Sequence, residues 1–124
     1  MRDGSCKQLN YKLILRGPTT LQACSPDLSE GIIEAHSKDG YPQAAVGHTA
    51  DHRLILFVSD GRQPDFSEGM TYEEVAHVLK EFGAVDAIAF DGGGSATMVM
   101  ADGKSGKPRV LNRPSDGKER AVGN

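Results

Sequence analysis

The chain has 124 residues, 38% of them hydrophobic and 25% charged, with a formal net charge of −3. This length suits one domain with a single core, and the negative balance argues against nucleic acid as the main partner, because phosphate backbones bind basic faces. No apolar stretch is long enough to span a bilayer, and the first seven residues lack the apolar segment of a signal peptide.

The N-terminal third of the chain carries little pattern. Residues 11–16 are predicted to form a strand and residues 31–36 a short second strand, with proline- and glycine-containing loops around them. Cys6 and Cys24 can pair, but two cysteines are far below the density of a disulfide scaffold and lack the spacing of a zinc site. Pairing of these cysteines is therefore an open alternative.

A hairpin is predicted next, with strands at 44–49 and 54–59 joined by a turn at 50–53. The second strand, Leu-Ile-Leu-Phe-Val-Ser, is a continuous apolar run, which predicts a central strand buried on both faces. It stops at Asp60-Gly61-Arg62, an acid and a glycine followed by a basic residue.

The spacing predicts one principal helix over about residues 71–82. Thr71 is the expected N-cap, Glu74 completes a capping box, and Gly83 supplies the stop. Since His77 lies nearly opposite the apolar stripe, we expect its imidazole to point outward. The expected buried face consists of Val75, Val78, Leu79 and Phe82.

A third buried strand, residues 85–90, ends at Asp91 and three consecutive glycines, and the apolar run 96–100 leaves the turn. Three glycines remove every Cβ and let a ligand come close, and consecutive N–H groups can form an anion-binding nest. A plain hairpin turn reverses the chain with a single glycine. The block Gly92, Gly93 and Gly94, with the hydroxyls of Ser95 and Thr97, therefore indicates a functional site more than a simple turn.

The last quarter of the chain is read as a polar hairpin loop at 101–108, a strand at 109–111, a turn at 112–117 and a final strand at 119–123. We therefore predict an α+β fold, a mixed β-sheet with one principal helix packed on it, in a single domain over residues 1–124.

The two strands on either side of the helix are expected to be parallel neighbours, because a strand–helix–strand crossover of this length suits them. Asp60 and Asp91 then emerge at the same edge of the sheet, where ligands of α/β sheets bind. Arg62 reaches the same cleft, and Asn112 and Arg120 can close it.

These residue types suit a substrate that carries both a sugar and a phosphate. Arginine grips phosphate with two parallel hydrogen bonds, and a pair of carboxylates can do acid–base or nucleophilic work at an anomeric carbon. The alternative, in which Asp60 and Asp91 only shape turns and Arg62 is their surface partner, stays open on spacing alone.

Four blocks of the chain closely resemble the phosphodiester glycosidase family, that of the mannose-6-phosphate uncovering enzyme, N-acetylglucosamine-1-phosphodiester α-N-acetylglucosaminidase, and its bacterial relatives. The resemblance covers about residues 42–124, in the family's order and spacing, and is nearer to the bacterial members; residues 1–41 stay unassigned, as a truncated or divergent part. The blocks are Val58-Ser-Asp-Gly-Arg-Gln63, Glu68-Gly-Met-Thr-Tyr-Glu-Glu-Val-Ala76, Phe82 to Met98 and Val110 to Asn124.

The resemblance implies hydrolysis of a sugar-1-phosphodiester, which releases a sugar such as N-acetylglucosamine and leaves a phosphomonoester. It makes Asp91 and Asp60 the catalytic candidates, without fixing which one protonates and which one stabilises the oxocarbenium-like centre. The candidates for binding substrate and phosphate are Arg62, Gly92, Gly93, Gly94, Ser95, Thr97, Asn112 and Arg120.

No cofactor is expected, although a divalent cation is an open alternative because Asp60, Asp91 and Asp116 offer oxygen ligands. The expected partner is a small-molecule or glycan phosphodiester, with no nucleic acid and no membrane span. The family resemblance suggests a secreted, cell-envelope or lumenal location.

Three departures from the family pattern leave other functions open. Gln43 and Ala44 stand where the family usually has Arg and Thr, Ala89 stands where it usually has Asn, and residues 1–41 lack its Asn-Gly-Gly-type block. One alternative is a catalytically impaired module that binds phosphosugars or anionic glycans. Another is a fragment whose sheet is completed by an oligomer or a partner chain.

Overall fold

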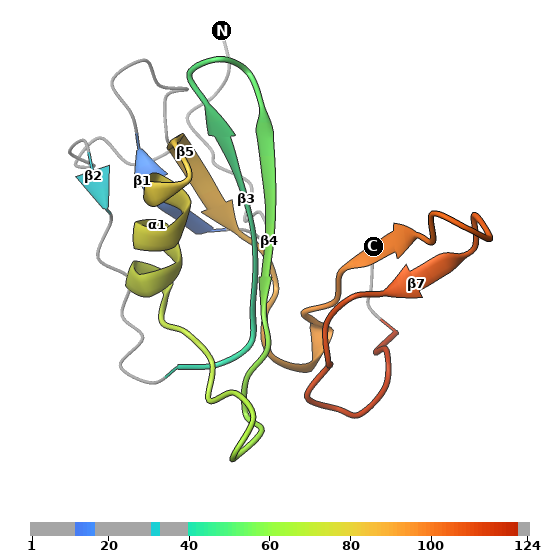
Figure 1. The fold of residues 1–124 in the computed structure, drawn as a ribbon. Helices are drawn as coiled ribbons and strands as arrows, with labels where there is room; N and C mark the ends of the chain where they lie inside the picture. Colours follow the sequence, from blue (N-terminus) through green and yellow to red (C-terminus); the bar gives the residue numbers. More distant parts are fainter. Residues whose placement is uncertain (1–11, 17–30, 33–39, 122–124) are drawn as a thin grey trace, which may run out of the picture.

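The computed structural model describes residues 12–16, 31–32 and 40–121. Within these residues, five strands form one sheet in the order β2-β1-β5-β3-β4, and one α-helix covers one face of it (Figure 1). The sheet strands are β1 (Lys12–Arg16), β2 (Gly31–Ile32), β3 (Gln43–Thr49), β4 (Leu54–Ser59) and β5 (Ala84–Ala89). The other elements are α1 (Tyr72–Glu81), the 3-10 helix η1 (Gly93–Ser95), β6 (Val99–Ala101) and β7 (Pro108–Val110). The predicted α+β class is confirmed; Cys6 and Cys24 lie outside the described residues.

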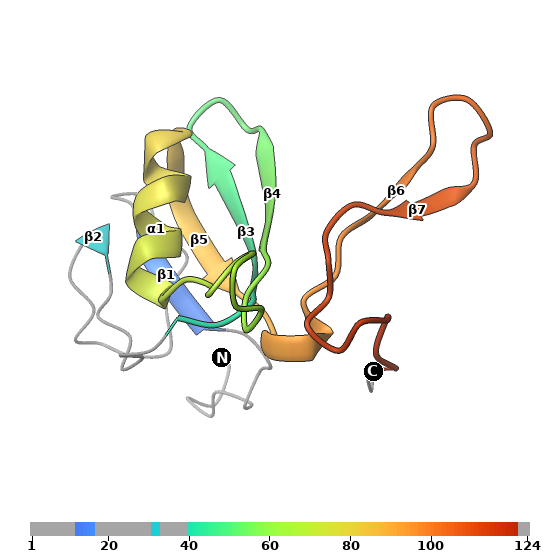
Figure 2. The same cartoon turned by 60° about the horizontal axis from the view of Figure 1, so that its bottom comes forward.

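The order of the sheet corrects the predicted neighbourhood of β4 and β5. Both strands are antiparallel to β3, which lies between them, so they run in the same direction as next-but-one neighbours. Val46 of β3, for example, pairs with Leu56 on one side and Ile88 on the other. The β3–β4 hairpin keeps those two strands adjacent, and β5 is left to pair with the other edge of β3. Because the direction is kept, β4 and β5 still end at the same end of the sheet (Figure 2).

The core lies between α1 and the face of the sheet that the helix covers. On β3, residues 43, 45, 47 and 49 are buried and alternate with half-buried ones, as expected for a strand with one covered face. The buried hydrophobic residues are Ile14, Leu15, Ala45, Val75, Ala76, Leu79, Ala84, Ala87 and Ala89.

The helix begins and ends where the sequence predicts. Thr71 Oγ1 accepts a hydrogen bond of 3.2 Å from the Glu74 N–H, and Glu74 Oε2 accepts one of 2.7 Å from the Thr71 N–H, which completes the capping box. Gly83 has a φ of 94°, a left-handed conformation that suits a helix stop. His77 is exposed, as predicted.

The predicted burial of β4 on both faces and of Phe82 in the core is wrong. β4 is an edge strand of the described sheet, and Leu54 and Leu56 are 73% and 68% exposed because they point to the face that lacks the helix. Phe82 is 68% exposed, since it caps the helix at the point where the chain turns away toward β5. Continuous apolar character alone therefore did not distinguish an edge strand from a central one.

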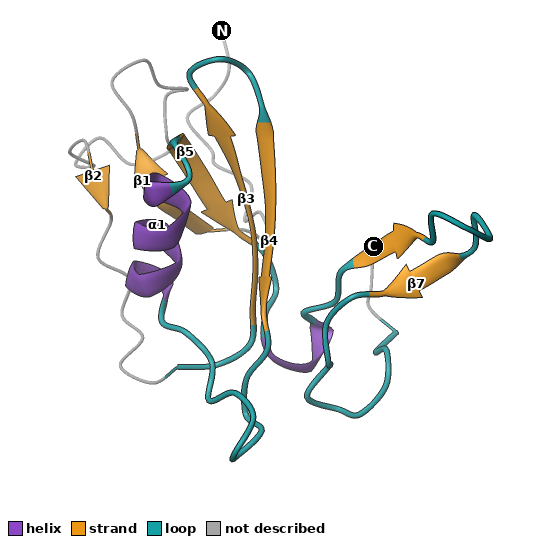
Figure 3. Ribbon diagram, in the orientation of Figure 1, coloured by secondary structure: helices purple, strands orange, loops and turns teal. Residues whose placement is uncertain are grey.

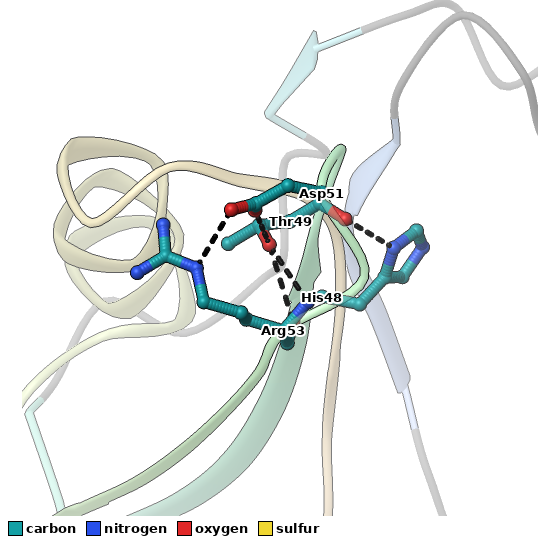
Figure 4. A network of polar contacts seen from close by, with 4 residues as sticks. All are labelled: His48, Thr49, Asp51 and Arg53. Carbon is teal, nitrogen blue, oxygen red and sulfur yellow. Dashed lines mark hydrogen bonds and ion pairs between the residues drawn. The ribbon is translucent and has the colours of Figure 1, made fainter.

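The turn that joins β3 and β4 is held by its own side chains, at the far end of the sheet from the glycine block (Figure 4). The Thr49 hydroxyl donates to Asp51 and accepts from the Arg53 N–H at 3.0 Å, and Arg53 Nε lies 3.0 Å from Asp51 Oδ2. The hydrogen bond from Thr49, helped by Arg53, lowers the pKa of Asp51 below 3.8. This network closes the hairpin and plays no part in the candidate site.

After β5 the chain forms η1 and then a two-stranded hairpin, β6 and β7, that extends away from the sheet (Figures 2 and 3). Val99 pairs with Val110 and Ala101 with Pro108. The predicted run 96–100 is thus a strand only from Val99 onward. Residues 119–121 are not a strand, which contradicts the described part of the predicted final strand.

Candidate functional site

The glycine block lies at the end of the sheet where β4 and β5 finish, and it is tied to the chain that enters β3. The Gly93 N–H donates a hydrogen bond of 2.8 Å to the Pro42 carbonyl, and the Ala96 N–H donates one of 3.1 Å to the Gly93 carbonyl. One of the three glycine N–H groups in the predicted nest is therefore already used. Gly93 has a φ of 65°, which favours glycine at this position.

Gly92 and Gly93 each lie directly beneath a side chain from a distant segment. A Cβ at Gly92 would be 2.5 Å from the Pro42 carbonyl oxygen and 2.9 Å from a ring carbon of Tyr41. A Cβ at Gly93 would be 3.0 Å from Arg62 Nη1. The missing side chains thus make room for a tyrosine ring and a guanidinium group.

Gly94 lies beneath an arginine–aspartate pair. A Cβ there would be 2.5 Å from the Asp116 carboxyl carbon and closer still to Arg120 Nη2. Arg120 Nε donates to Asp116 Oδ2 at 2.7 Å, and Nη2 donates to Oδ1 at 3.1 Å. The pair is bidentate, and both of its side chains remain partly open to solvent.

The charges of the site act on one another through these pairs. The hydrogen bond from Arg120 lowers the pKa of Asp116 below 3.8, and the positive charge of Arg62 adds to the effect. The hydrogen bond to Asp116 raises the pKa of Arg120, and the charge of Asp91 contributes. Around the glycine block, Asp116 therefore interacts with both Arg62 and Arg120, and Arg120 also interacts with Asp91.

Asp91 differs from the other carboxylates of the site because it is exposed and forms no hydrogen bond or ion pair with any described residue. The negative charge of Asp91 helps to raise the pKa of both Arg120 and Tyr72. Since no described residue binds the Asp91 oxygens, this carboxylate is available to a ligand.

Asp60, by contrast, is engaged by the loop that follows β7. Its Oδ1 accepts hydrogen bonds from the Asn112 side-chain amide at 3.1 Å and from the Arg113 N–H at 2.9 Å. Asn112 Nδ2 also donates to the Ala96 carbonyl at 2.8 Å, and its Oδ1 accepts from the Met98 N–H at 2.8 Å. Both side chains thus join the loop to the glycine block; the catalytic role of Asp60 and the substrate-binding role of Asn112 stay predictions.

Two tyrosines that the sequence did not single out complete the site. Tyr41 and Tyr72 meet edge to face, with ring centroids 5.7 Å apart, and the Arg62 guanidinium lies 5.7 Å from the centre of the Tyr41 ring. Burial, together with a hydrogen bond to Tyr41, raises the pKa of Tyr72 to about 12. Tyr41 precedes β3 and Tyr72 opens α1, so only the assembled fold brings them together. Ser95 and Thr97 are half-buried beside Gly94.

Two of the three positions that depart from the family pattern, Gln43 and Ala89, are buried. Gln43 is fully buried, and its amide nitrogen donates to the Met70 carbonyl at 3.1 Å. Its Oε1 is buried and has no hydrogen-bond partner among the described residues. Ala89 is 1% exposed, and Ala44 is half-buried. At Gln43 and Ala89, the chain therefore differs from the family pattern beneath the site rather than on its surface.

In the part of the chain that the structure describes, no three His, Cys, Asp or Glu side chains gather as a group that could hold a metal ion. Asp60 and Asp116 already accept hydrogen bonds from protein donors. A divalent cation stays a prediction. The one described α-helix is too short and too polar to cross a membrane.

Comparison with known proteins identifies the family. The family model described as phosphodiester glycosidase matches residues 9–124, which extends the predicted match toward the N-terminus. N-acetylglucosamine-1-phosphodiester α-N-acetylglucosaminidase of Mus musculus is 43% identical over 58 residues, 47% of this chain and 11% of the relative. The Homo sapiens enzyme of the same name is 40% identical over 58 residues, with the same coverage. The SPbeta prophage-derived uncharacterized protein YomE of Bacillus subtilis strain 168 is 34% identical over 82 residues, 66% of this chain and 12% of the relative.

The chain thus spans about a tenth of the length of these curated relatives, and the family model covers nearly all of the chain. The glycine block, with Arg62 and Arg120 on it, lies inside the matched range. The chain belongs to the phosphodiester glycosidase family.

Proposed function

We propose that this chain is a glycosidase domain that hydrolyses sugar-1-phosphodiesters, releasing the sugar and leaving a phosphomonoester. The observation that carries the proposal is the placement of two guanidinium groups, Arg62 and Arg120, on Gly93 and Gly94, with the uncommitted Asp91 carboxylate within electrostatic reach. The names of the animal relatives, which state a phosphodiester substrate, support the same reaction class.

The arginines suit the leaving group. A phosphodiester carries one negative charge, and breaking the bond between the anomeric carbon and the bridging oxygen leaves a phosphomonoester with a second. Fixed guanidinium groups stabilise charge that develops in the transition state, and they do so best through paired N–H donors aimed at phosphate oxygens. We therefore assign to the phosphate Arg62 and the N–H groups of Arg120 that are not used by Asp116.

Asp91 suits the sugar side of the same bond. A carboxylate beside the anomeric carbon can stabilise the oxocarbenium-like centre or activate the water that replaces the phosphate. The bridging oxygen leaves with the phosphate, and the water supplies the new hydroxyl of the sugar. Because a phosphate is a weakly basic leaving group, the arginines can accommodate its charge without a separate acid.

The test is the hydrolysis of the methyl diester of N-acetylglucosamine-1-phosphate by the wild-type chain, by Asp91→Asn and by the control Asp65→Asn. Asp65 is an exposed aspartate with a φ of 66°, a conformation that asparagine tolerates. Removing a group that acts at the reacting bond should lower kcat about 100-fold or more, while Asp65→Asn should match the wild type. Equal turnover by Asp91→Asn and the wild type would remove the role given to Asp91.

The engaged state of Asp60 favours a second candidate, a phosphosugar-binding module without hydrolysis. Asp60 is held by Asn112 and Arg113, so Asp91 is the one carboxylate of the two that is free to act. Calorimetry with N-acetylglucosamine-1-phosphate separates the two functions: saturable binding in a chain that releases no sugar from the methyl diester supports the binding module.

A further inference from the structure

Charge is divided unevenly along the described chain. The described residues before Val99, which form the five-stranded sheet, the helix and the glycine block, carry five Lys or Arg against nine Asp or Glu. Residues 99–121, which form the β6–β7 hairpin and the loop after it, carry six against three. An acidic body therefore bears a basic arm, although the net charge of the whole chain is negative.

The basic side chains of the β6–β7 hairpin itself have no charged partner among the described residues. Lys104, Lys107 and Arg109 form no ion pair with any described residue, and all three are exposed. Lys107 and Arg109 are two residues apart on an extended segment, which puts them on the same side at a spacing of about 7 Å. The hairpin makes its main contacts between its own two strands and projects away from the sheet (Figure 2).

The tip of the arm is held in one shape. Asp102 Oδ2 accepts hydrogen bonds from the Ser105 N–H at 3.0 Å and from its hydroxyl at 2.9 Å. The Asp102 N–H donates to the Lys107 carbonyl at 2.8 Å, and the Gly106 N–H donates to the Asp102 carbonyl at 2.8 Å. The hydrogen bonds from Ser105 to the carboxylate lower the pKa of Asp102 below 3.8. The loop therefore holds the backbone from which Lys104 and Lys107 extend.

The row of cations starts at the candidate site. Arg113, at the base of the arm, donates its N–H to Asp60, and its guanidinium lies 4.6 Å from the centre of the Phe66 ring. From there β7 leads outward through Arg109 and Lys107 to the tip. A negatively charged chain bound at the glycine block could thus continue along the arm and meet one cation after another.

We propose that the β6–β7 hairpin binds the polyanionic part of a polymeric substrate, a chain of polyols or sugars linked by phosphodiesters, whose terminal glycosyl phosphate occupies the glycine block. This inference rests on the proposed function for its terminal residue, but the binding surface is independent of turnover. Nucleic acid is the competing polyanion. Residues 99–121 contain no Phe, Tyr or Trp on which bases could stack, so the arm suits a polymer without bases.

The experiment compares the wild-type chain with a triple variant, Lys104→Gln, Lys107→Gln and Arg109→Gln, and with the control Lys80→Gln on the exposed side of α1. Binding of fluorescently labelled poly(glycerol phosphate) is followed by anisotropy at several salt concentrations. The triple variant should bind at least tenfold more weakly, and the slope of log K against log salt should fall by about two. Lys80→Gln should bind as the wild type does, and hydrolysis of the small methyl diester should be the same in all three proteins.

Each outcome decides one of the two proposals. If no protein hydrolyses the diester while the triple variant still loses polymer binding, the proposed function fails and the arm inference stands. If the diester is hydrolysed but the triple variant binds the polymer as the wild type does, the arm inference is overturned. Binding of single-stranded DNA of equal phosphate number at least as tight as that of poly(glycerol phosphate) would overturn the assignment to a polymer without bases.

Discussion

The side-chain amide of Asn112 donates a hydrogen bond to Asp60 Oδ1 across 52 positions of sequence. Through the same side chain the loop after β7 also binds Ala96 and Met98, which flank the exit of the glycine block. Asn112 thus links Asp60, which follows β4, to Ala96 and Met98, which follow η1. Arg120 and Asp116 come from the loop that this asparagine anchors.

Replacing Asn112 by alanine should therefore loosen the whole loop. The Met98 N–H and the Ala96 carbonyl lose their partner, which should lower the free energy of unfolding by about 2 kcal/mol. Urea denaturation of Asn112→Ala measures this, with Lys118→Ala, an exposed lysine of the same loop, as the control within about 0.5 kcal/mol of the wild type. Equal stability of Asn112→Ala and the wild type would contradict the anchoring role.

Gly94→Ala should weaken phosphate binding with little effect on folding. The new methyl group would displace Arg120 and Asp116, whose side chains are 46% and 37% exposed and can move aside. We expect N-acetylglucosamine-1-phosphate to bind about tenfold more weakly, which corresponds to about 1.4 kcal/mol, as measured by calorimetry. Gly103→Ala is the matched control, because a Cβ at Gly103 meets nothing within 4 Å.

The Tyr72 phenol should ionise at a higher pH than a free tyrosine, so the free energy of unfolding should depend on pH in the alkaline range. Burial raises its pKa from 10.0 to about 12, so the folded chain holds this proton where the unfolded chain loses it. The folded state therefore loses stability as pH rises from 10 to 12, and keeps this contribution below pH 10. Comparing the phenolate absorbance of the wild type with that of Tyr72→Phe identifies the group that ionises at high pH. Between pH 10 and 12, the thermal unfolding temperature should fall more steeply in the wild type than in Tyr72→Phe.

Alanine substitutions at Leu79 and Phe82, both near the end of α1, should differ in how much they lower the free energy of unfolding. Leu79→Ala removes a fully buried side chain and should cost about 2 to 5 kcal/mol. Phe82→Ala removes a larger side chain that is 68% exposed and should cost less. Chemical denaturation of both variants measures the difference, and a greater loss in Phe82→Ala would place the aromatic ring in the core.

Features set by neighbouring residues were predictable from the sequence. The capping box of Thr71 and Glu74, the stop at Gly83 and the strands of the hairpin depend on local pattern, and all of them occur as predicted. The close approach of distant side chains to the glycine block was also predictable, because three glycines remove every Cβ from the turn. A functional role of this block stays a prediction.

Features set by the assembled sheet were not predictable in the same way. The run 54–59 is apolar enough for a central strand, yet the order of the sheet puts it at the described edge. Tyr41 joins the site because its chain enters β3 beside Gly92, a contact that no local spacing encodes. The engagement of Asp60 by Asn112 likewise depends on how the last loop folds back.

β5 pairs with β1 on one side and with β3 on the other, so it joins the β3–β4 hairpin to the N-terminal strands. The β3–β4 hairpin is local and can form early, whereas the pairing of Lys12 with Ala89 must bring together residues that are far apart in the sequence. Such non-local pairing is a slow event in folding. Because the glycine block follows β5 directly, we expect the candidate site to take shape only after β5 has paired with both of its neighbours.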